Sequence, residues 1–262
     1  MMMTQDAELL LREDNNGITT LTLNRPNQFN ALSGELLAAM TQVLDAIKAD
    51  DSVRVVILKA SGRAFCVGHD LKEMRANSNR EFIKDLFTRC GAMMQRIEAL
   101  PQPVIASVHA TATAAGCQLA AACDLAVASD HSRFAVSGIT LGLFCSTPAV
   151  ALSRNIGRKA AMDMLLTGDF IDAPTAKEYG LVNKVVPAET LDAAVQEMAE
   201  KIASRPPEAV QLGKELFYRQ LDKPLNEAYE MASEAITCNM LMDDTLEGVD
   251  AFIEKRKPNW KR

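Results

Sequence analysis

Two short apolar runs constrain the fold of this chain more than any other feature of its sequence. The runs Val55–Leu58 and Val104–Val108 have the length of strands, and neither shows the polar and apolar alternation of a half-exposed strand. A strand that is apolar on both faces must be covered on both faces, and helices usually provide that cover. We therefore predict buried strands with covering helices, which is an α/β fold.

Local signals extend this pattern towards the N-terminus. The segments Leu9–Arg12 and Gly17–Leu23 flank Asp14–Gly17, which is a strong turn signal, and together they predict a β-hairpin. Ser33 is a good N-cap for a helix that runs to about Ala49, because apolar residues recur on one face of that segment. The first part of the chain is thus expected to alternate extended and helical elements.

This alternation ends towards the C-terminus. Gly116–Cys123 predicts a short buried helix, Leu125–Ala128 a further strand, and Leu181–Val186 the last strand. Beyond that strand the sequence is rich in alanine and glutamate and is broken at prolines, which indicates helices. We predict two regions, an α/β core over residues 1–190 and a helical C-terminal region over residues 191–262.

Charge and composition disfavour several classes of function. The 262 residues include 34 acidic and 28 basic side chains, and the net charge of −6 disfavours nucleic acid, which usually needs a basic surface. No apolar segment has membrane-spanning length and no signal or transit peptide is visible, so we expect no membrane partner and a cytoplasmic location. With only three histidines, and six cysteines that form no C-x-x-C pair, no metal site is expected.

The most informative stretch is Ser61–Glu73, which follows the first buried strand. It breaks at Gly68, after which Asp70 and Glu73 have the spacing of a helix N-cap and its reciprocal partner. A chain that leaves a strand, turns at a glycine and enters a helix exposes unpaired backbone N–H groups, and the amide of His69 is one of them. The same spacing also fits a well-capped turn without a chemical role, and spacing alone leaves both interpretations open.

A second stretch of the same kind is Ala112–Leu119. Its small residues follow the strand Val104–Val108, so a ligand or another backbone segment could approach closely. The helix that starts here offers amides at the positive end of its dipole. Two amides that point at one carbonyl oxygen form an oxyanion hole, which stabilises negative charge on that oxygen. Small residues serve plain helix packing equally well.

Together these stretches make the chain resemble the crotonase, or enoyl-CoA hydratase/isomerase, superfamily. The motifs that carry the resemblance extend over almost the whole chain and are Leu23–Pro26, Asn30–Leu32, Phe65–Glu73, Pro103–Val108, Gly116–Ala120, Cys123–Leu125, Leu166–Gly168, Ala176, Gly180–Val182 and Phe252–Lys257. The later run Gly142–Pro148 most resembles one branch of that family. The resemblance implies a spiral of ββα units with a helical C-terminal region that mediates homotrimers, which often pair into hexamers.

For the site, the resemblance implies an acyl-CoA thioester as the substrate, with no separate cofactor. The backbone amides of His69 and Ala115 match the positions that form the family's oxyanion hole. The family usually has glycine where this chain has Ala114 and Ala115. An alanine keeps the N–H and fits a helical backbone there, but it would be strained at positive φ.

The resemblance also implies where coenzyme A binds. Val67 and Leu71 would line the adenine pocket through their main chain. Phe252 and Lys255 match positions that reach the adenine and phosphate end from the C-terminal helix, in some members from a neighbouring subunit. The basic tail Ile253–Arg262 would then meet the phosphates, although such a tail can also be a solvated, charged terminus.

Two departures from the family pattern bear on the reaction. Family hydratases use two glutamates to position water and move a proton, and these would fall at Gln118 and near Gly138 in this chain. Glutamine can orient a water molecule but cannot exchange a proton near neutral pH, and glycine can do neither. Hydration by paired carboxylates is therefore not expected, and glutamates at both positions are the change that would restore it.

Other side chains offer alternatives. A histidine at position 69 resembles a branch of the family that decarboxylates CoA esters, although the His69 side chain can equally point away from the thioester. Cys145 lies where other branches place an acid or a nucleophile, but no motif lowers the pKa of its thiol, and a packed thiol is the alternative. The remaining polar residues of interest are given structural roles: Asp70 caps a helix, Asp124 closes a turn, and His109 and His131 are structural.

These observations leave two main functional hypotheses. The first is an enzyme of the enoyl-CoA hydratase/isomerase type, a lyase by family, that stabilises a thioester oxyanion or enolate with backbone amides. Its reaction could be isomerisation, decarboxylation or thioester hydrolysis. The second is a non-catalytic, regulatory protein that keeps the acyl-CoA pocket. RNA binding, known for one branch of the family, is disfavoured by the acidic balance.

Overall fold

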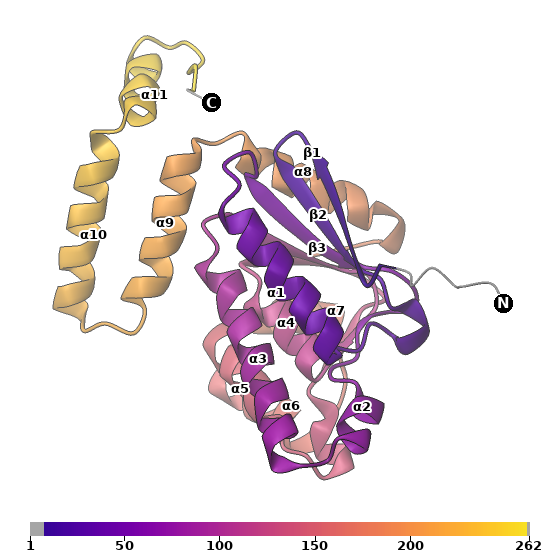
Figure 1. The fold of residues 1–262 in the computed structure, drawn as a ribbon. Coiled ribbons are helices and arrows are strands. Elements are labelled where there is room, and N and C mark those ends of the chain that lie inside the picture. Colours follow the sequence, from indigo (N-terminus) through magenta and orange to yellow (C-terminus); the bar gives the residue numbers. More distant parts are fainter. Residues whose placement is uncertain (1–7, 261–262) are drawn as a thin grey trace.

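A six-stranded sheet with the strand order β1-β2-β3-β5-β7-β10 lies at the centre of the molecule (Figure 1). Its strands are β1 (Leu10–Asn15), β2 (Ile18–Leu23), β3 (Val55–Ala60), β5 (Val104–Val108), β7 (Leu125–Ser129) and β10 (Lys184–Val186). β1 pairs with β2 in antiparallel orientation, and every other pair in this sheet is parallel. The computed structural model describes residues 8–260.

A second, smaller sheet completes a ββα repeat. Its strands are β4 (Ala64–Cys66), β6 (Thr111–Thr113), β8 (Arg133–Ala135) and β9 (Ile171–Asp172). Each of β4, β6 and β8 directly follows a strand of the large sheet, and each leads into a helical segment. These segments are α2 (Leu71–Ala76), α4 (Ala115–Ala122) and the 3-10 helix η2 (Ser137–Leu141). The predicted spiral of ββα units is therefore confirmed.

The other helices surround this framework and extend beyond it. They are α1 (Gly34–Lys48), α3 (Arg80–Ala99), α5 (Ser146–Asn155), α6 (Arg158–Thr167), α7 (Ala173–Tyr179), α8 (Leu191–Ala203), α9 (Pro207–Gln220), α10 (Leu225–Met240) and α11 (Asp243–Ile253), with 3-10 turns η1 (Pro26–Gln28) and η3 (Ala188–Thr190). Within residues 8–260, no helix is both long and apolar enough to cross a membrane.

The large sheet is buried on both faces, as its apolar strands predict. Successive side chains of a strand point to opposite faces. In β3, Val56 and Leu58 join the main core with residues of α1 and α3, whereas Val55 and Ile57 join a second cluster that α8 completes. Helices on both sides therefore account for the uninterrupted apolar run.

Two local signals at the N-terminal side are confirmed. The hairpin turns at Asn16 and Gly17, whose φ angles are 50° and 78°, as the favoured two-residue turn requires. The Ser33 hydroxyl accepts a hydrogen bond from the amide of Leu36 and so caps α1. Sequence signals of this kind work because both partners lie within a few residues of each other.

The predicted last strand is shorter than expected. Only Lys184–Val186 is extended, and it pairs with β7. The amides of Leu181 and Val182 bond instead to the carbonyl of Ala176 in α7. The C-cap of α7 is Gly180, whose φ is 90°. The apolar residues before β10 thus belong to a helix C-cap, a structure in which hydrophobic residues are also common.

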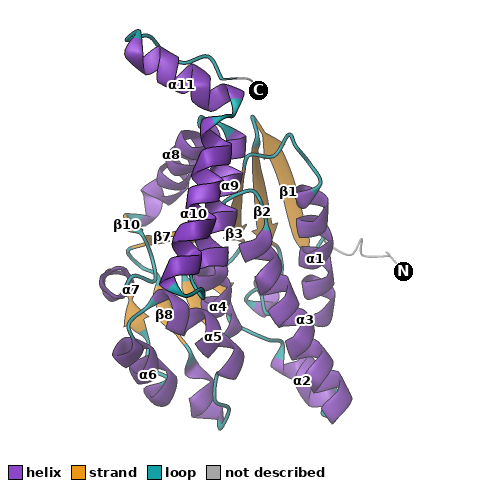
Figure 2. Ribbon diagram, turned by 90° about the vertical axis from the view of Figure 1, so that its left-hand side faces the viewer, coloured by secondary structure: helices purple, strands orange, loops and turns teal. Residues whose placement is uncertain are grey.

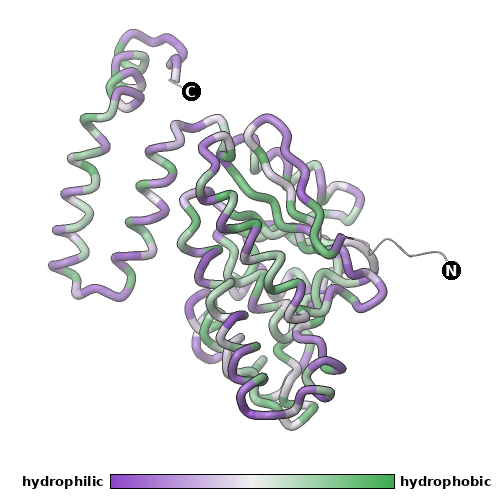
Figure 3. Tube along the Cα trace, viewed as in Figure 1, coloured by the Kyte–Doolittle hydropathy of each residue, from purple (hydrophilic) through white to green (hydrophobic). Residues whose placement is uncertain are grey.

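The last two helices, α10 and α11, stand away from the body (Figure 1). α9 and α10 lie side by side and α11 follows at their outer end (Figure 1; Figure 2). Neither α9 nor α10 contains a buried residue, and hydrophobic positions alternate with hydrophilic ones along both (Figure 3). α8, in contrast, packs on the large sheet through Leu191, Val195 and Ala199. The division between residues 190 and 191 stays a prediction.

A polar anchor holds α9 against the body. The ammonium group of Lys214 lies 2.7 Å from Oδ2 of Asp124, and it also donates to the carbonyls of Ile97 and Gln102. The hydroxyl of Tyr218 donates to Oδ1 of Asp124 at 2.8 Å. The expectation that Asp124 merely closes a turn is therefore wrong, because its side-chain partners lie on a helix about 90 residues further along the chain.

Candidate active site

The two turns singled out in the sequence lie side by side. β4 and β6 are parallel neighbours with Cys66 opposite Ala112, so the segments after their C-terminal ends are brought together. Gly68 has a φ of 95°, and a Cβ placed on it would lie 3.3 Å from the amide nitrogen of Ala115. The segment that carries His69 is therefore in contact with the start of α4.

Two backbone amides at this contact are free to bind a ligand. Ala115 is the first residue of α4, so its N–H precedes the hydrogen-bond ladder of the helix. His69 forms an isolated bridge with Leu32, but the bonds of that bridge are made by its neighbours Gly68 and Asp70. Within residues 8–260, neither amide has a hydrogen-bond acceptor. The predicted oxyanion donors thus lie on adjoining segments.

Both segments open onto one cavity of about 520 Å³. Its wall is mostly apolar and comes from the two turns, α2, α3, η2 and the start of α5. The lining residues are Val67, His69, Leu71, Met74, Ile83, Phe87, Ala114, Ala115, Ser137, Gly138, Leu141, Leu143, Phe144, Cys145, Ser146, Thr147 and Pro148. Among these described residues there is no aspartate, glutamate, lysine or arginine. A ligand would be held by apolar contacts and a few neutral polar groups, as is usual in small-molecule sites.

The His69 side chain is packed as a neutral ring. It meets Phe87 edge to face with the ring centroids 4.8 Å apart. Burial lowers the pKa of the imidazole. Both ring nitrogens are buried and have no hydrogen-bond partner within residues 8–260. The contribution of His69 to the site is therefore its amide and an uncharged surface.

Cys145 is a packed thiol at the start of α5. Its Sγ accepts a hydrogen bond from the amide of Gly138 at 3.3 Å. Burial raises the pKa of this thiol, and the Gly138 amide only partly counteracts that effect. Since the thiolate is the nucleophilic form, this environment does not activate Cys145.

The cavity wall leaves no room for a side chain at position 138. A Cβ on Gly138 would lie 2.6 Å from the carbonyl oxygen of Leu143 and 2.7 Å from Sγ of Cys145. The amide of Leu143 bonds to the carbonyl of Gly138, so the loop after η2 is folded directly over this residue. The structure therefore contradicts the expectation that a glutamate could simply be added here.

Gln118, the other replacement, is buried within α4. Its side chain is 5% exposed, and Oε1 has no partner within the described part of the chain. Gln118 is not among the residues that line the cavity. An unpaired buried amide oxygen is costly, so a bound water or a ligand group would improve its environment.

The residues expected to bind coenzyme A fall into two groups. Val67 and Leu71 line the cavity. Phe252 and Lys255 lie at the end of α11, at the opposite end of the molecule from α2 (Figure 1; Figure 2). Arg256, in the same basic tail, is paired with glutamates of its own chain. The last two residues of that tail lie outside the described residues.

The predicted capping box is half correct. Oδ1 of Asp70 accepts hydrogen bonds from the amides of Lys72 and Glu73 and so caps α2. Glu73 does not return the bond, because the amide of Asp70 is already bonded to the carbonyl of Leu32. The Glu73 carboxylate accepts instead from the amide of Gly34 at 3.0 Å, at the start of α1. A distant segment has taken the place of the expected local partner.

Several residues that line the cavity were not predicted from the sequence. Ile83 and Phe87 enter the cavity from one face of α3, and their i, i+4 spacing is a signal that could have grouped them. Ser137 lines the cavity with its hydroxyl 2.9 Å from that of Thr113. No local pattern pairs these two hydroxyls, because the pairing of β6 with β8 brings them together.

Ala114 adopts the positive φ at which an alanine is expected to be strained. Its φ and ψ are 50° and −122°, a region that favours glycine. We expect Ala114→Gly to stabilise the protein by about 1 kcal/mol and to raise Tm by about 2–4 °C, because it removes this strain. Thermal unfolding of the two proteins under one condition measures the effect, and an unchanged or lower Tm would show that the surrounding contacts already relieve the strain.

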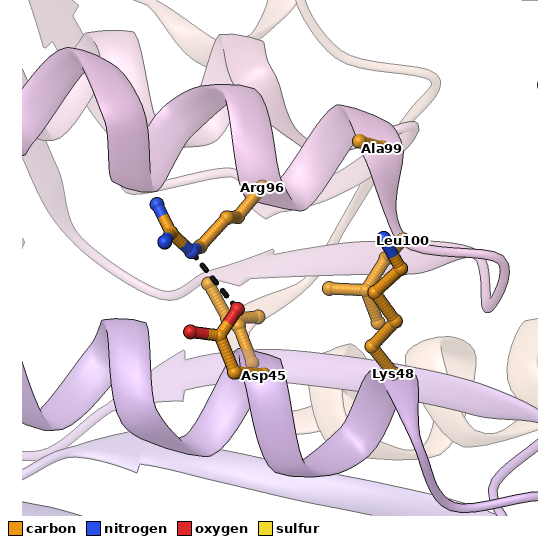
Figure 4. A pocket seen from close by; sticks show the side chains of 6 residues that line it. Asp45, Lys48, Arg96, Ala99 and Leu100 are labelled. Carbon is orange, nitrogen blue, oxygen red and sulfur yellow. Dashed lines mark hydrogen bonds and ion pairs between the residues drawn. The ribbon is translucent and has the colours of Figure 1, made fainter.

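A second, smaller cavity of about 240 Å³ lies between the C-terminal ends of α1 and α3. Figure 4 shows Asp45 and Arg96 facing each other across it, and their ion pair spans 2.9 Å. Lys48 and Leu100 lie at the other end of this cavity. None of the predicted site residues lines it. Separately, residues 8–260 contain no group of three or more histidine, cysteine or acidic side chains that could hold a metal ion.

The fold is a ββα spiral in which two free amides at adjoining turns lie beside a cavity without charged side chains, and these features define a class of protein. Residues 13–262 match the enoyl-CoA hydratase/isomerase family, and the chain belongs to it. It is similar to enoyl-CoA hydratase domain-containing protein 3 of Xenopus laevis, with 45% identity over 98% of this chain and 87% of that protein. The crystal structure of the human protein of that name has a TM-score of 0.94 and 42% identity, covering 97% of this chain and all of the other (100%). The branch that Gly142–Pro148 resembles is thereby confirmed.

A crystal structure of an enoyl-CoA hydratase from Mycobacterium smegmatis is also similar. Its TM-score is 0.96 at 56% identity, and the match covers 97% of this chain and 99% of that one. These neighbours confirm the crotonase fold along nearly the whole chain.

The expected cytoplasmic location is contradicted by the names of the relatives. The similar proteins from Xenopus laevis, Mus musculus, Rattus norvegicus and Homo sapiens are all named mitochondrial. Targeting segments, rather than the composition or the fold of the mature domain, direct a protein to its compartment. Composition and fold therefore carry no information on the location. Residues 1–7, on which the expectation partly rested, lie outside the described residues.

Proposed function

We propose that the chain binds an acyl-CoA thioester in the cavity, with the thioester oxygen at the amides of His69 and Ala115. The observation that carries this proposal is the contact between the two turns, which brings two free N–H groups to one cavity. Donors in this arrangement stabilise the oxyanion or enolate that forms on the thioester, and one such donor is typically worth about 10²–10³ in rate. Membership of the enoyl-CoA hydratase/isomerase family supports the choice of ligand.

The site stabilises negative charge without supplying a strong acid or base. Among the described lining residues, the only side chains that titrate near the physiological range are His69 and Cys145, and burial favours the neutral form of both. The amides need no resident cofactor to polarise a carbonyl. We therefore propose an enzyme of this family whose reaction proceeds through a stabilised enolate or oxyanion, such as isomerisation, decarboxylation or thioester hydrolysis.

A non-catalytic, regulatory acyl-CoA binder is the second candidate. It is favoured by the loss of both family carboxylates, which are replaced by Gln118 and Gly138. In addition, the loop at Leu143 and Cys145 fills the space beside Gly138. Such a protein would keep the amides and the apolar cavity and would bind the same ligands without turnover.

The adenine end of the ligand is expected to meet a second copy of the chain. Phe252 is 85% exposed, and α11, which carries it, lies at the opposite end of the molecule from α2 (Figure 1; Figure 2). Apolar side chains of the outlying helices are also exposed, including Leu221, Leu225, Tyr229, Ile236 and Leu241. An exposed apolar area of this extent is typical of an interface. We therefore propose a homotrimer or a hexamer in which Phe252 and Lys255 serve a neighbouring cavity.

The proposal predicts ligand binding without hydration. Acetyl-CoA at 100 times its Kd should raise Tm by about 5–10 °C, whereas wild-type protein should hydrate crotonyl-CoA negligibly. The double variant Gln118→Glu with Gly138→Glu should gain no hydration, because a side chain at position 138 collides with Leu143 and Cys145. Thermal unfolding and loss of the ultraviolet absorbance of the enoyl thioester measure the two effects.

A screen of short acyl-, enoyl- and malonyl-type CoA esters, with product detection by mass, separates the candidates. Turnover of any ester supports the enzyme, and binding of several esters with turnover of none supports the regulatory protein. An unchanged Tm at saturating concentrations of all esters would contradict both the enzyme and the regulatory acyl-CoA binder. Rapid hydration of crotonyl-CoA by the wild type would show that the argument from the missing glutamates is wrong.

A further inference from the structure

The peptide that presents the His69 amide is clamped from one side. The amide of Leu32 donates to the carbonyl of Gly68 at 2.7 Å, and the amide of Asp70 donates to the carbonyl of Leu32 at 3.2 Å. In such a bridge, the residue between the two bonded neighbours directs its own N–H and C=O to the other side. The clamp on Leu32 therefore determines the direction in which the N–H of His69 points.

Arg25 ties together both sides of this bridge. Its Nη2 donates to Oδ2 of Asp70 at 3.1 Å, and its Nη1 donates to the carbonyl of Ala31, the neighbour of Leu32. The side chains of Arg25 and Asp70 are only 14% and 16% exposed. One guanidinium thus links the residue after His69 with the residue before its bridge partner.

Asp70 transmits this restraint in two directions. While Oδ2 faces Arg25, Oδ1 accepts from the amides of Lys72 and Glu73 and fixes the start of α2. Burial raises the pKa of Asp70, but the Glu73 amide and the Arg25 guanidinium outweigh it and hold the pKa below its usual range. The carboxylate is therefore ionised at neutral pH and can keep both sets of partners.

Arg25 is itself held in place by its surroundings. Its backbone amide donates to Oδ1 of Asn30 at 2.8 Å. Nδ2 of Asn30 donates to the carbonyls of Ser61 and Ala64, on either side of the turn before β4. The two motifs that include Arg25 and Asn30 thus brace the β3–β4 unit, and nothing in the proposed reaction uses them directly.

We propose that Arg25 is a positioning residue for the oxyanion-binding amide of His69. It acts through Asp70 and the Leu32 bridge, and it does not touch the thioester. This inference rests on the proposed function, since it assumes that the His69 amide binds the thioester oxygen. A purely structural role for Arg25 would weaken the fold without changing how the bound carbonyl is polarised.

The test compares Arg25→Met with Arg25→Lys, Asp70→Asn and the control Arg12→Met. Arg12, in β1 of the hairpin, also pairs with two carboxylates, Asp14 and Asp50, but it does not line the cavity. For each protein, the carbonyl stretching frequency of bound, isotope-labelled acetyl-CoA is measured by infrared difference spectroscopy. The ratio of the Kd of free CoA to the Kd of acetyl-CoA is measured as well, because free CoA lacks the thioester carbonyl.

We expect the carbonyl frequency of acetyl-CoA to fall on binding to the wild type. In Arg25→Met and Asp70→Asn it should return towards the free value, and the preference for acetyl-CoA over CoA should fall about two- to tenfold, as for a weakened hydrogen bond. Arg25→Lys should restore part of both effects, and Arg12→Met should change neither.

The outcomes separate this inference from the proposed function. If the wild type binds no acetyl-CoA or shows no change in frequency, the proposed function fails. If the wild type shows the change and both Arg25→Met and Asp70→Asn retain it, the positioning role is overturned. Arg25→Met is judged unfolded if it binds no CoA and shows no cooperative thermal unfolding. In that case Asp70→Asn alone tests the positioning role, because asparagine keeps the side-chain oxygen that caps α2.

Discussion

Replacing Lys214 with methionine is expected to destabilise the protein by about 3–5 kcal/mol and to loosen α9 from the body. The side chains of Lys214 and Asp124 are 7% and 13% exposed. Burial lowers the pKa of Lys214, and the neighbouring Asp124 carboxylate opposes this. Removing the lysine alone leaves the Asp124 carboxylate buried, and within residues 8–260 its remaining partners are the Tyr218 hydroxyl and the Val104 amide.

The same helix offers a matched control for this prediction. Arg219 pairs with Glu215 one turn away, and both side chains are well exposed, at 64% and 62%. Arg219→Met should cost no more than about 0.5 kcal/mol. Urea unfolding gives the free energies, and hydrogen exchange of the α9 amides reports its detachment. Equal effects of the two substitutions would mean that the anchor contributes nothing beyond a surface ion pair.

The second large effect is expected for Gly116→Ala. Gly116 lies in the first turn of α4, where the helix approaches β4 most closely, and a Cβ there would lie 2.6 Å from the carbonyl carbon of Cys66. Backbone atoms cannot move aside as a flexible side chain can, so α4 must shift as a unit. We expect a loss of about 3 kcal/mol, at the upper end for an overpacked core.

The shift of α4 also has a consequence for the site. Ala115 precedes Gly116, so its amide moves with the helix and away from the segment of Gly68 and His69. The variant should therefore lose the rise in Tm caused by acetyl-CoA even where it remains folded. Gly91→Ala in α3 is the control, because within residues 8–260 no atom beyond its chain neighbours and the adjacent backbone of α3 lies within 4 Å of the added methyl group. This change should stabilise the protein by about 0.5–1 kcal/mol. Full acetyl-CoA binding by Gly116→Ala would contradict the close packing of α4 as a requirement of the site.

The parts of the fold that could be predicted from the sequence are those with local causes. The apolar runs of β3 and β5, the turn at Asn16 and Gly17, and the cap at Ser33 all depend on residues within a few positions of one another. The same is true of the two turns, where a strand end, a glycine or small residues and a helix start indicate exposed amides. That the amides of His69 and Ala115 act as the pair of donors was implied by the family resemblance.

The predictions that were wrong concern side chains whose partners are distant in the sequence. Asp124 was assigned to a turn, but it bonds to Lys214 and Tyr218 of α9. Glu73 was assigned to a capping box, but its carboxylate accepts from the amide of Gly34. A carboxylate in a sequence shows that it needs donors, but not which of several distant donors it meets. The lack of space beside Gly138 was likewise invisible, because it comes from a loop folded back over η2.

The sequence by itself thus determined the alternation of buried strands and helices, the family, and the absence of both carboxylates from the positions where the family keeps them. These follow from residue type and short-range order, which the sequence states directly. Only the tertiary structure decided that two free amides adjoin one cavity, that burial keeps His69 and Cys145 neutral, and that Arg25 reaches across to Asp70. These depend on the dielectric environment and on contacts between distant segments, which exist only once the sheets and helices have packed.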